Sequence, residues 1–155
     1  MQLILWRHAE AAPGLPDEAR PLTDTGRLHA QQMAQWLRLR LPADLLILSS
    51  PAVRTRQTAE TLALPYSLSD ALARHGSANA MRDAAGWPDN TRSVMLVGHQ
   101  PLLGELLVLL LGASTPLDDM PKAGIWWLKA QRSAGRLVIG VEAVIGPASL
   151  QSGST

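Results

Sequence analysis

Four basic side chains stand at, or shortly after, the ends of three separate apolar runs of the sequence. They are Arg7, His8, Arg54 and His99. Guanidinium groups stay charged at physiological pH and donate forked hydrogen bonds, so two of them can hold one tetrahedral oxyanion. A neutral imidazole can attack phosphorus, and neighbouring guanidinium groups favour that form by lowering the imidazole pKa. Brought together, these side chains would form a cationic pocket for phosphate that contains its own nucleophile.

Two further features would support such a pocket. A second imidazole opposite the nucleophile could donate to the phosphoryl oxygens as negative charge develops. Helices predicted to begin after Ser50 and after Gln100 would direct backbone N–H groups at the anion, which makes Gln100 a candidate for phosphate contact.

No His, Asp or Glu cluster has metal-ligand spacing, and the sequence has no cysteine for thiol chemistry. No metal site is therefore expected.

The apolar runs are the predicted strands that must position these residues. They are Leu3–Trp6, Leu45–Leu48 and Val94–Val97. Continuous apolar runs of this length are typical of strands buried on both faces. A helical pattern follows each run, over about 24–41, 50–63 and 101–111, with a shorter helix at 78–85. Ser50 is the predicted N-cap of the second helix. Ligands bind such alternating folds at the carboxyl ends of the strands, where the basic residues stand.

The C-terminal third predicts an antiparallel hairpin. Ile125–Ala130 and Leu137–Val144 flank a turn that contains Gly135. We therefore expect an α/β fold, a three-layer α/β/α sandwich whose mostly parallel central sheet carries the hairpin at its edge. Residues 1–145 would form a single domain, and the small, polar residues 146–155 a flexible C-terminal tail. The proline-rich segment 9–23 reads as a long loop, in which Glu10 either orients the site or caps the loop.

The composition excludes several classes of protein. A net charge of +1 over 155 residues, without a run of lysines or arginines, gives no reason to expect a nucleic-acid partner. The longest apolar run, Leu106–Leu111, is too short to span a membrane. No signal-peptide pattern begins the sequence, so a cytoplasmic location is expected. The oligomeric state is left open, and a monomer is compatible with the sequence.

Four motifs, spread over nearly the whole chain, resemble those of the histidine phosphatase (phosphoglycerate mutase-like) superfamily, and especially its phosphohistidine phosphatase SixA group. They are Leu5-Trp6-Arg7-His8-Ala9-Glu10-Ala11, Arg20-Pro21-Leu22-Thr23-Asp24-Thr25-Gly26, Ser50-Pro51-Ala52-Val53-Arg54-Thr55-Arg56-Gln57-Thr58 and Val97-Gly98-His99-Gln100-Pro101. One such motif alone is weak evidence, whereas four in order are specific.

The resemblance implies a phosphoglycerate mutase-like fold and a role for each matching residue. His8 would become phosphorylated, Arg7 and Arg54 would bind the phosphoryl group, and His99 would complete the pocket. Arg20 would be an additional basic contact of this small subgroup. The family needs no metal or cofactor. One departure is Ala9, which stands where the superfamily usually has glycine.

A second departure bears on the substrate. Superfamily enzymes that act on alkyl phosphates generally carry a carboxylic acid in the middle segment, where it protonates the leaving alkoxide. The comparable segment here, Leu72–Gly76, contains no carboxylate. Phosphohistidine releases an imidazole from a labile P–N bond and depends less on such an acid. The gap favours a protein phosphohistidine phosphatase that acts on histidine-phosphotransfer or similar signalling domains. Side chains that the fold could still bring into reach as an acid are Asp17, Glu18, Asp70 and His75.

Two other functions stay open on the sequence. The same pocket would serve a general phosphomonoesterase for small metabolites or phosphoserine. It would also serve a catalytically silent module that binds phosphate without turnover. The partner is accordingly expected to be a phosphorylated protein of the histidine-phosphotransfer type or a small phosphate ester.

Overall fold

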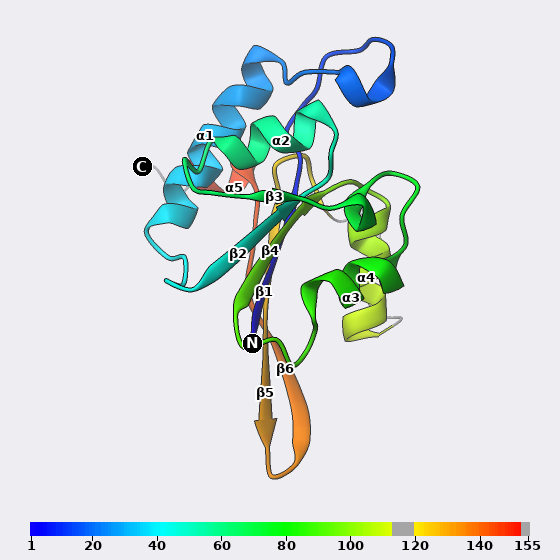
Figure 1. The fold of residues 1–155 in the computed structure, drawn as a ribbon. Coiled ribbons are helices and arrows are strands. Elements are labelled where there is room, and N and C mark those ends of the chain that lie inside the picture. Colours follow the sequence, from blue (N-terminus) through cyan, green and yellow to red (C-terminus); the bar gives the residue numbers. More distant parts are fainter. Residues whose placement is uncertain (113–119, 153–155) are drawn as a thin grey trace.

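Six strands form one mixed sheet in the computed structural model, which describes residues 1–112 and 120–152 (Figure 1). They are β1 (Gln2–Arg7), β2 (Leu45–Ser49), β3 (Ser67–Leu68), β4 (Ser93–Gly98), β5 (Ile125–Ser133) and β6 (Arg136–Ile145). Their order is β3-β2-β4-β1-β5-β6. The pairs β1·β4, β2·β4 and β2·β3 are parallel, whereas β5 is antiparallel to both β1 and β6. The expected parallel sheet with an antiparallel hairpin at its edge is confirmed.

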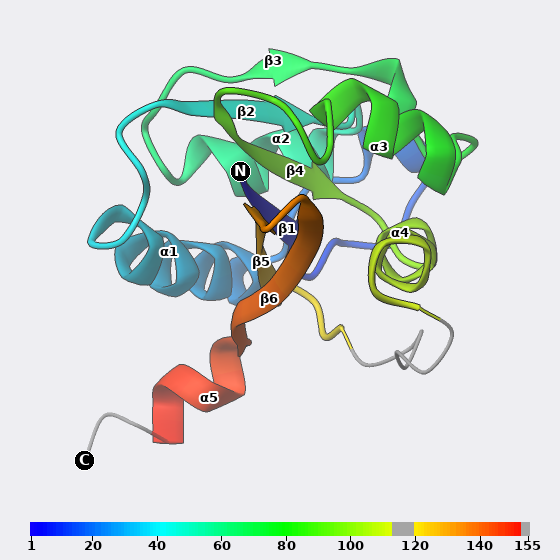
Figure 2. The same cartoon turned by 90° about the horizontal axis from the view of Figure 1, so that it is seen from below.

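Helices cover both faces of this sheet, as the view along it shows (Figure 2). They are α1 (Asp24–Arg38), α2 (Val53–Glu60), α3 (Ala78–Ala85), α4 (Leu102–Leu111) and α5 (Pro147–Ser152), with short 3-10 helices η1 (Asp17–Ala19) and η2 (Asp70–Leu72). Buried residues of α1 and α2 pack on one face, and those of α3 and α4 on the other. The predicted three-layer α/β/α arrangement is therefore confirmed. No helix in the described ranges is long and apolar enough to cross a membrane.

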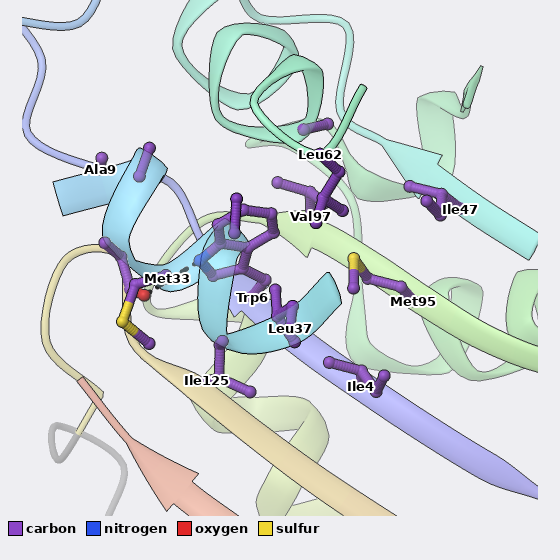
Figure 3. Packing of buried hydrophobic residues seen from close by; sticks show 14 of the residues in the cluster. Ile4, Trp6, Ala9, Met33, Leu37, Ile47, Leu62, Met95, Val97 and Ile125 are labelled. Carbon is purple, nitrogen blue, oxygen red and sulfur yellow. Dashed lines mark hydrogen bonds between the residues drawn. The ribbon is translucent and has the colours of Figure 1, made fainter. Parts of the chain in front are cut away.

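Strand β1 lies inside the sheet and supplies both halves of the core. Side chains alternate along a strand, so Ile4 and Trp6 pack toward α1 and α2, while Leu3 and Leu5 pack toward α3 and α4. Figure 3 shows the Trp6 ring among its apolar neighbours on the α1 side. Its Nε1–H donates to the carbonyl of Ala123 at 2.9 Å. Burial of each such side chain contributes roughly 1.5–3 kcal/mol, which fixes the strand that ends at Arg7.

Helix boundaries differ from the sequence predictions in three places, one of which is the end of α2 at Glu60 rather than near residue 63. Helix α1 ends at Arg38 rather than near Leu41. The N-cap of α2 is Ala52 and not Ser50. The Ser50 hydroxyl accepts the Ala52 N–H at 3.3 Å and lies 2.8 Å from His99 Nε2. The side chain that the N-cap preference for serine assigns to the start of α2 therefore makes a tertiary contact with His99 instead.

The C-terminal segment contains a short helix. Helix α5 occupies Pro147–Ser152, within the residues 146–155 that the sequence predicts as a tail. Leu150 packs against the core cluster formed by α1, α2 and the sheet. One apolar side chain thus anchors a segment that is otherwise small and polar. Residues 153–155 of the predicted tail lie outside the described residues.

Candidate active site

A cavity of about 210 Å³ lies at the carboxyl ends of β1 and β4 and gathers side chains from distant parts of the chain. It is lined by Arg7, His8, Asp17, Arg20, Arg54, Arg74, His99, Gln100 and Lys122. All of the residues that the sequence predicts for the pocket are therefore brought together. The parallel pairing of β1 with β4 explains why the two histidines meet. The last residues of the two strands, Arg7 and Gly98, lie opposite each other, and a histidine directly follows each of them.

The backbone around the first histidine is held on several sides. The N–H of His8 donates to the Gly98 carbonyl at 3.1 Å, and its own carbonyl accepts from Ala123 N–H at 3.1 Å. The N–H of Ala9 donates to Thr58 Oγ1, on helix α2, at 3.1 Å. These bonds tie the end of β1 to β4, to α2 and to the segment that precedes β5. The position of the imidazole is thus fixed before any ligand binds.

The His8 ring is oriented and neutral. Its Nδ1 lies 2.7 Å from the carbonyl of Ala9, and because a carbonyl only accepts, Nδ1 carries the proton and Nε2 the free electron pair. Only 8% of the residue is exposed. Burial, with the charges of Arg54 and Arg7, lowers the pKa of His8 to about 4, although the bond to Ala9 opposes this effect. At neutral pH the ring is therefore an uncharged imidazole with a nucleophilic nitrogen.

The second imidazole faces the first. The ring centroids of His8 and His99 lie 5.4 Å apart, with 60° between the planes. His99 Nε2 is 2.8 Å from Ser50 Oγ, and His99 Nδ1 is buried with no hydrogen-bond partner in the part of the chain that the structure describes. Burial, and then the charge of Arg54, lowers the pKa of His99 to about 3. Ser50, which the sequence predicts as a helix cap, is thus the residue that orients this ring.

The buried guanidinium group of Arg54 and the half-buried one of Arg7 complete the cationic wall. Arg54 is 2% exposed, and its Nη1 and Nη2 donate to the backbone carbonyl and the carboxylate of Asp17 at 2.9 and 3.0 Å. Arg7 Nη1 donates to the Met120 carbonyl at 2.8 Å. Among the described residues, the Nε atoms of both arginines and His99 Nδ1 are buried without a hydrogen-bond partner. A buried unpaired polar group costs about 1–3 kcal/mol. A tetrahedral oxyanion in the cavity would offer acceptors to this set of donors.

Asp17, which the sequence offers as a possible acid, lies among the arginines that line the cavity. Its carboxylate contacts Arg74 at 2.7 Å, Arg20 at 2.9 Å and Arg54 at 3.0 Å. Hydrogen bonds from Arg74, and then from Arg20 and Arg54, hold the pKa of Asp17 well below its usual range. The group is an anion throughout the physiological range, and therefore it is no proton donor.

The loop that carries Asp17 is fastened by residues of the sequence motifs. The N–H of Leu22 donates to Gln57 Oε1 at 2.8 Å. Thr23 caps α1 through Gly26 N–H at 2.9 Å, and its hydroxyl donates to Glu10 Oε1 at 2.8 Å. A Cβ on Gly26 would meet the Glu10 carbonyl oxygen at 2.1 Å, so this close approach requires glycine. Of the two roles open to Glu10, the contacts show the loop anchor.

A second cavity of about 190 Å³ adjoins the first and shares His99 and Arg74 with it. Glu18, Asp70 and His75 also line it. The fold thus places three of the candidate proton donors beside the cationic pocket rather than inside it. Across the described ranges, no group of three or more His, Cys, Asp or Glu residues could hold a metal ion.

Arg74 and Lys122 are the cavity residues that the sequence analysis did not propose. Arg74 follows η2, and Lys122 lies in the segment that precedes β5. Neither stands at the end of an apolar run, so the strand-end rule gave no signal for them. For Asp17 the sequence offers two roles, an acid that the fold could bring into reach and an ion-pair partner of Arg20, and the structure shows the ion pair at 2.9 Å.

We predict that Asp17→Asn tightens the binding of inorganic phosphate by about tenfold. The amide keeps the shape of the side chain and leaves the backbone carbonyl that Arg54 contacts. It removes a negative charge that competes with the ligand for the arginines. Two unit charges about 4 Å apart near a protein surface interact by a few kcal/mol, so removal of the repulsion between Asp17 and the phosphate should strengthen binding. Isothermal titration calorimetry measures the affinity, with Glu18→Gln as the neighbouring control. Weaker binding in Asp17→Asn would show instead that the carboxylate organises the arginines for the ligand.

Comparison with known proteins agrees with this geometry. Residues 3–75 match the histidine phosphatase superfamily (branch 1). An uncharacterised protein of Mycobacterium tuberculosis is 34% identical over 117 residues, covering 70% of this chain and 71% of that protein. The phosphohistidine phosphatase SixA homolog of Haemophilus influenzae is 28% identical over 137 residues, covering 78% of this chain and 84% of the homolog.

A solved structure shows the same likeness over almost the whole chain. The protein histidine phosphatase SixA in complex with tungstate superposes with a TM-score of 0.77 at 25% identity, covering 97% of this chain and 99% of the other. The predicted SixA-like architecture is thus confirmed, and the likenesses support a hydrolase of the phosphatase class. The chain belongs to the histidine phosphatase superfamily and resembles, within it, the SixA group.

Proposed function

We propose that this chain is a protein phosphohistidine phosphatase that works through a phosphorylated His8. The observation that carries the proposal is the neutral His8 imidazole, with Nδ1 bonded to the Ala9 carbonyl, in a cavity walled by Arg7, Arg54 and His99. Each of these three side chains has a buried nitrogen without a partner among the described residues. Tungstate, which the related SixA structure holds, is a tetrahedral oxyanion like phosphate. The substrate would be a phosphorylated protein domain of the histidine-phosphotransfer type.

In the first step, the electron pair of His8 Nε2 attacks phosphorus while the P–N bond of the substrate breaks. The substrate imidazole leaves with the electron pair of that bond, and it leaves neutral because its other ring nitrogen keeps a proton. Arg7 and Arg54 hold the phosphoryl oxygens, and the buried donors act more strongly than they would in water. His99 donates to an oxygen on which negative charge develops. The hydrogen bond to Ala9 supports the positive charge that His8 acquires on transfer.

In the second step, water attacks phosphorus and the bond to His8 Nε2 breaks. Both protons of the water remain on the phosphate, which leaves as a monoanion, and the electron pair returns to Nε2. His8 keeps its Nδ1 proton through both steps, because the Ala9 carbonyl accepts it throughout. The second step therefore regenerates the starting tautomer without rotation of the ring.

The choice of phosphohistidine over an ester rests on the state of Asp17. An alkoxide leaves poorly without a proton, and the carboxylate nearest to the phosphate donors is held ionised by three arginines. A protonated imidazole brings its own proton and needs none from the enzyme. Glu18, Asp70 and His75 line the adjoining cavity, so a phosphomonoesterase that uses one of them is the second candidate.

A substrate panel separates these two functions. We predict that a phosphohistidine-bearing phosphotransfer domain releases phosphate at least about a hundredfold faster, in kcat/KM, than phosphoserine or a sugar phosphate. The assay contains a chelator, because we also propose that turnover needs no metal ion. Phosphate release is followed with radiolabelled substrates. Faster turnover of an ester, together with loss of that activity in Glu18→Gln or Asp70→Asn, would replace the proposed function by the phosphomonoesterase.

A further inference from the structure

Strand β6 forms an open edge of the sheet, since the strand order ends with it. The hairpin of β5 and β6 extends beyond the other strands at the end where the N-terminus lies (Figure 1). Apolar side chains of β6 are exposed, with Leu137 at 40%, Val138 at 51% and Val141 at 48%. Natural edge strands are usually blunted by Lys, Pro, β-bulges or short length. The ten residues of β6 include neither Lys nor Pro, and the one bulge, at Glu142, lies near the C-terminal end of the strand. This edge is therefore suited to pair with another strand.

The turn decides which backbone groups of β6 face outward. Ser133 pairs with Arg136 across a two-residue loop in which Ala134 and Gly135 have φ of 51° and 77°, as in a type I′ turn. The residues that close such a loop exchange hydrogen bonds with each other, so Arg136 directs its N–H and C=O toward β5. By alternation, Leu137, Ile139 and Val141 direct theirs to the open edge.

We propose that β6 pairs with β6 of a second copy of this chain, antiparallel and centred on Ile139, to form a two-fold symmetric dimer with a continuous sheet. In this register Ile139 lies opposite its own equivalent, and Leu137 lies opposite Val141 of the second copy. The outward N–H and C=O groups of all three residues then find partners. The exposed side chains of Leu137 and Val141 form cross-strand apolar pairs, and the two-fold axis makes each pair occur twice.

Charge complementarity selects this register. When Ile139 is at the centre, Arg136 lies opposite Glu142 of the second copy, the residue at the β6 bulge, on both sides of the axis. Within the described part of the chain, neither side chain makes an ion pair. Glu142 lines a cavity together with Trp127. Ser133 lies on the same face of β5 as Trp127 by alternation, and Arg136 lies opposite Ser133, so Arg136 and Glu142 share one face of the sheet. A register centred on Val141 would instead place Glu142 opposite Gly140.

The pairing leaves the candidate active site open. The cavity lies at the carboxyl ends of β1 and β4, and β5 runs antiparallel to β1. The hairpin turn at 134–135 is therefore at the opposite end of the sheet from the cavity. Figure 1 shows the hairpin at the end of the sheet where the N-terminus lies. A dimer joined near Ile139 would present its two cavities at opposite ends to large phosphoprotein partners. The proposal does not depend on the chemistry that occurs in either cavity.

Charge reversal tests the proposal with the full chain. Sedimentation velocity over about 1–200 μM should show a monomer–dimer equilibrium for the unmodified protein. Arg136→Glu alone, or Glu142→Arg alone, opposes like charges at two positions and should raise the dimer Kd by about tenfold or more. The two variants mixed in equal amounts should form a heterodimer of about the original affinity, because every facing pair is then again of opposite sign. Arg27→Glu, on the exposed side of α1, makes the same charge change elsewhere and should have no effect.

The mixture of the two variants distinguishes loss of pairing from misfolding, because two misfolded variants would not form a heterodimer of the original affinity. The proposal is overturned if the unmodified chain remains a monomer up to about 200 μM, the highest concentration measured. It is also overturned if the single variants dimerise as well as the unmodified chain, or if mixing them restores nothing. In these cases the β6 edge is either unpaired or paired with a different partner.

Discussion

Replacement of His8 by alanine should abolish both turnover and the formation of a phosphoenzyme. In the proposed mechanism, Nε2 of this ring is the only atom that forms a bond to phosphorus before water does. Arg7, Arg54 and His99 would remain in place around the cavity and would still bind the anion. Loss of a nucleophile commonly costs about four to six orders of magnitude in kcat, while binding of phosphate should change little.

The phosphoenzyme gives a direct measurement of this effect. After incubation with a radiolabelled phosphohistidine protein, the unmodified chain should carry label that survives base and is lost in acid, as expected of phosphohistidine. His8→Ala should carry none. His29→Ala is the matched control, because His29 lies on α1 and does not line the cavity. If the unmodified chain binds phosphate but is never labelled by any substrate, the silent binding module replaces the enzyme.

Sequence reasoning located the pocket because its residues stand at points that simple rules fix. His8 and His99 follow buried strands whose parallel pairing could be inferred from the alternation of strands and helices. Arg54 lies in the first turn of a helix that follows a third strand, and such turns face the same edge of a sheet. These positions depend on backbone periodicity, which a single sequence expresses clearly.

The remaining parts depend on loop paths and on competition between contacts, which a single sequence does not express. Asp17 meets Arg54 only because the loop from Ala9 to Thr23 folds back over α2, where Gln57 fastens it. Ser50 has the residue type of an N-cap, yet its hydroxyl orients His99. The weak local preference at Ser50 yields to a buried tertiary hydrogen bond. Leu150 likewise anchors a segment whose composition resembles a tail.

The state of the two histidines follows from this same combination of burial and charge. Both folded-state pKa values, about 4 for His8 and about 3 for His99, lie below the ordinary value of 6.5. The unfolded chain therefore binds more protons between pH 6.5 and pH 3, and the free energy of unfolding falls as pH drops through this window. The features that keep His8 nucleophilic at neutral pH thus make the fold sensitive to acid.

Arg54→Ala should lower kcat/KM for phosphohistidine by about two to three orders of magnitude, the largest effect expected from any residue that does not itself react. Arg54 is almost fully buried, so its charge acts on the phosphoryl group with little screening by solvent. Removal of one such preorganised donor group typically costs about 3–4 kcal/mol of transition-state stabilisation. The fold should survive the change, because Asp17 keeps its contacts with Arg20 and Arg74.

Arg54→Lys and Arg56→Ala sharpen the interpretation of that loss. Lysine restores the charge but not the planar fork, so recovery of less than about a tenth of the lost activity is expected if two donors of one guanidinium hold the phosphoryl group. Arg56 lies on the same helix, is partly exposed and does not line the cavity, so Arg56→Ala should retain nearly full activity. Steady-state kinetics with thermal denaturation separates catalysis from stability. Full activity of Arg54→Ala would show that Arg54 does not hold the phosphoryl group in the transition state. Its role would then be limited to the hydrogen bonds with Asp17.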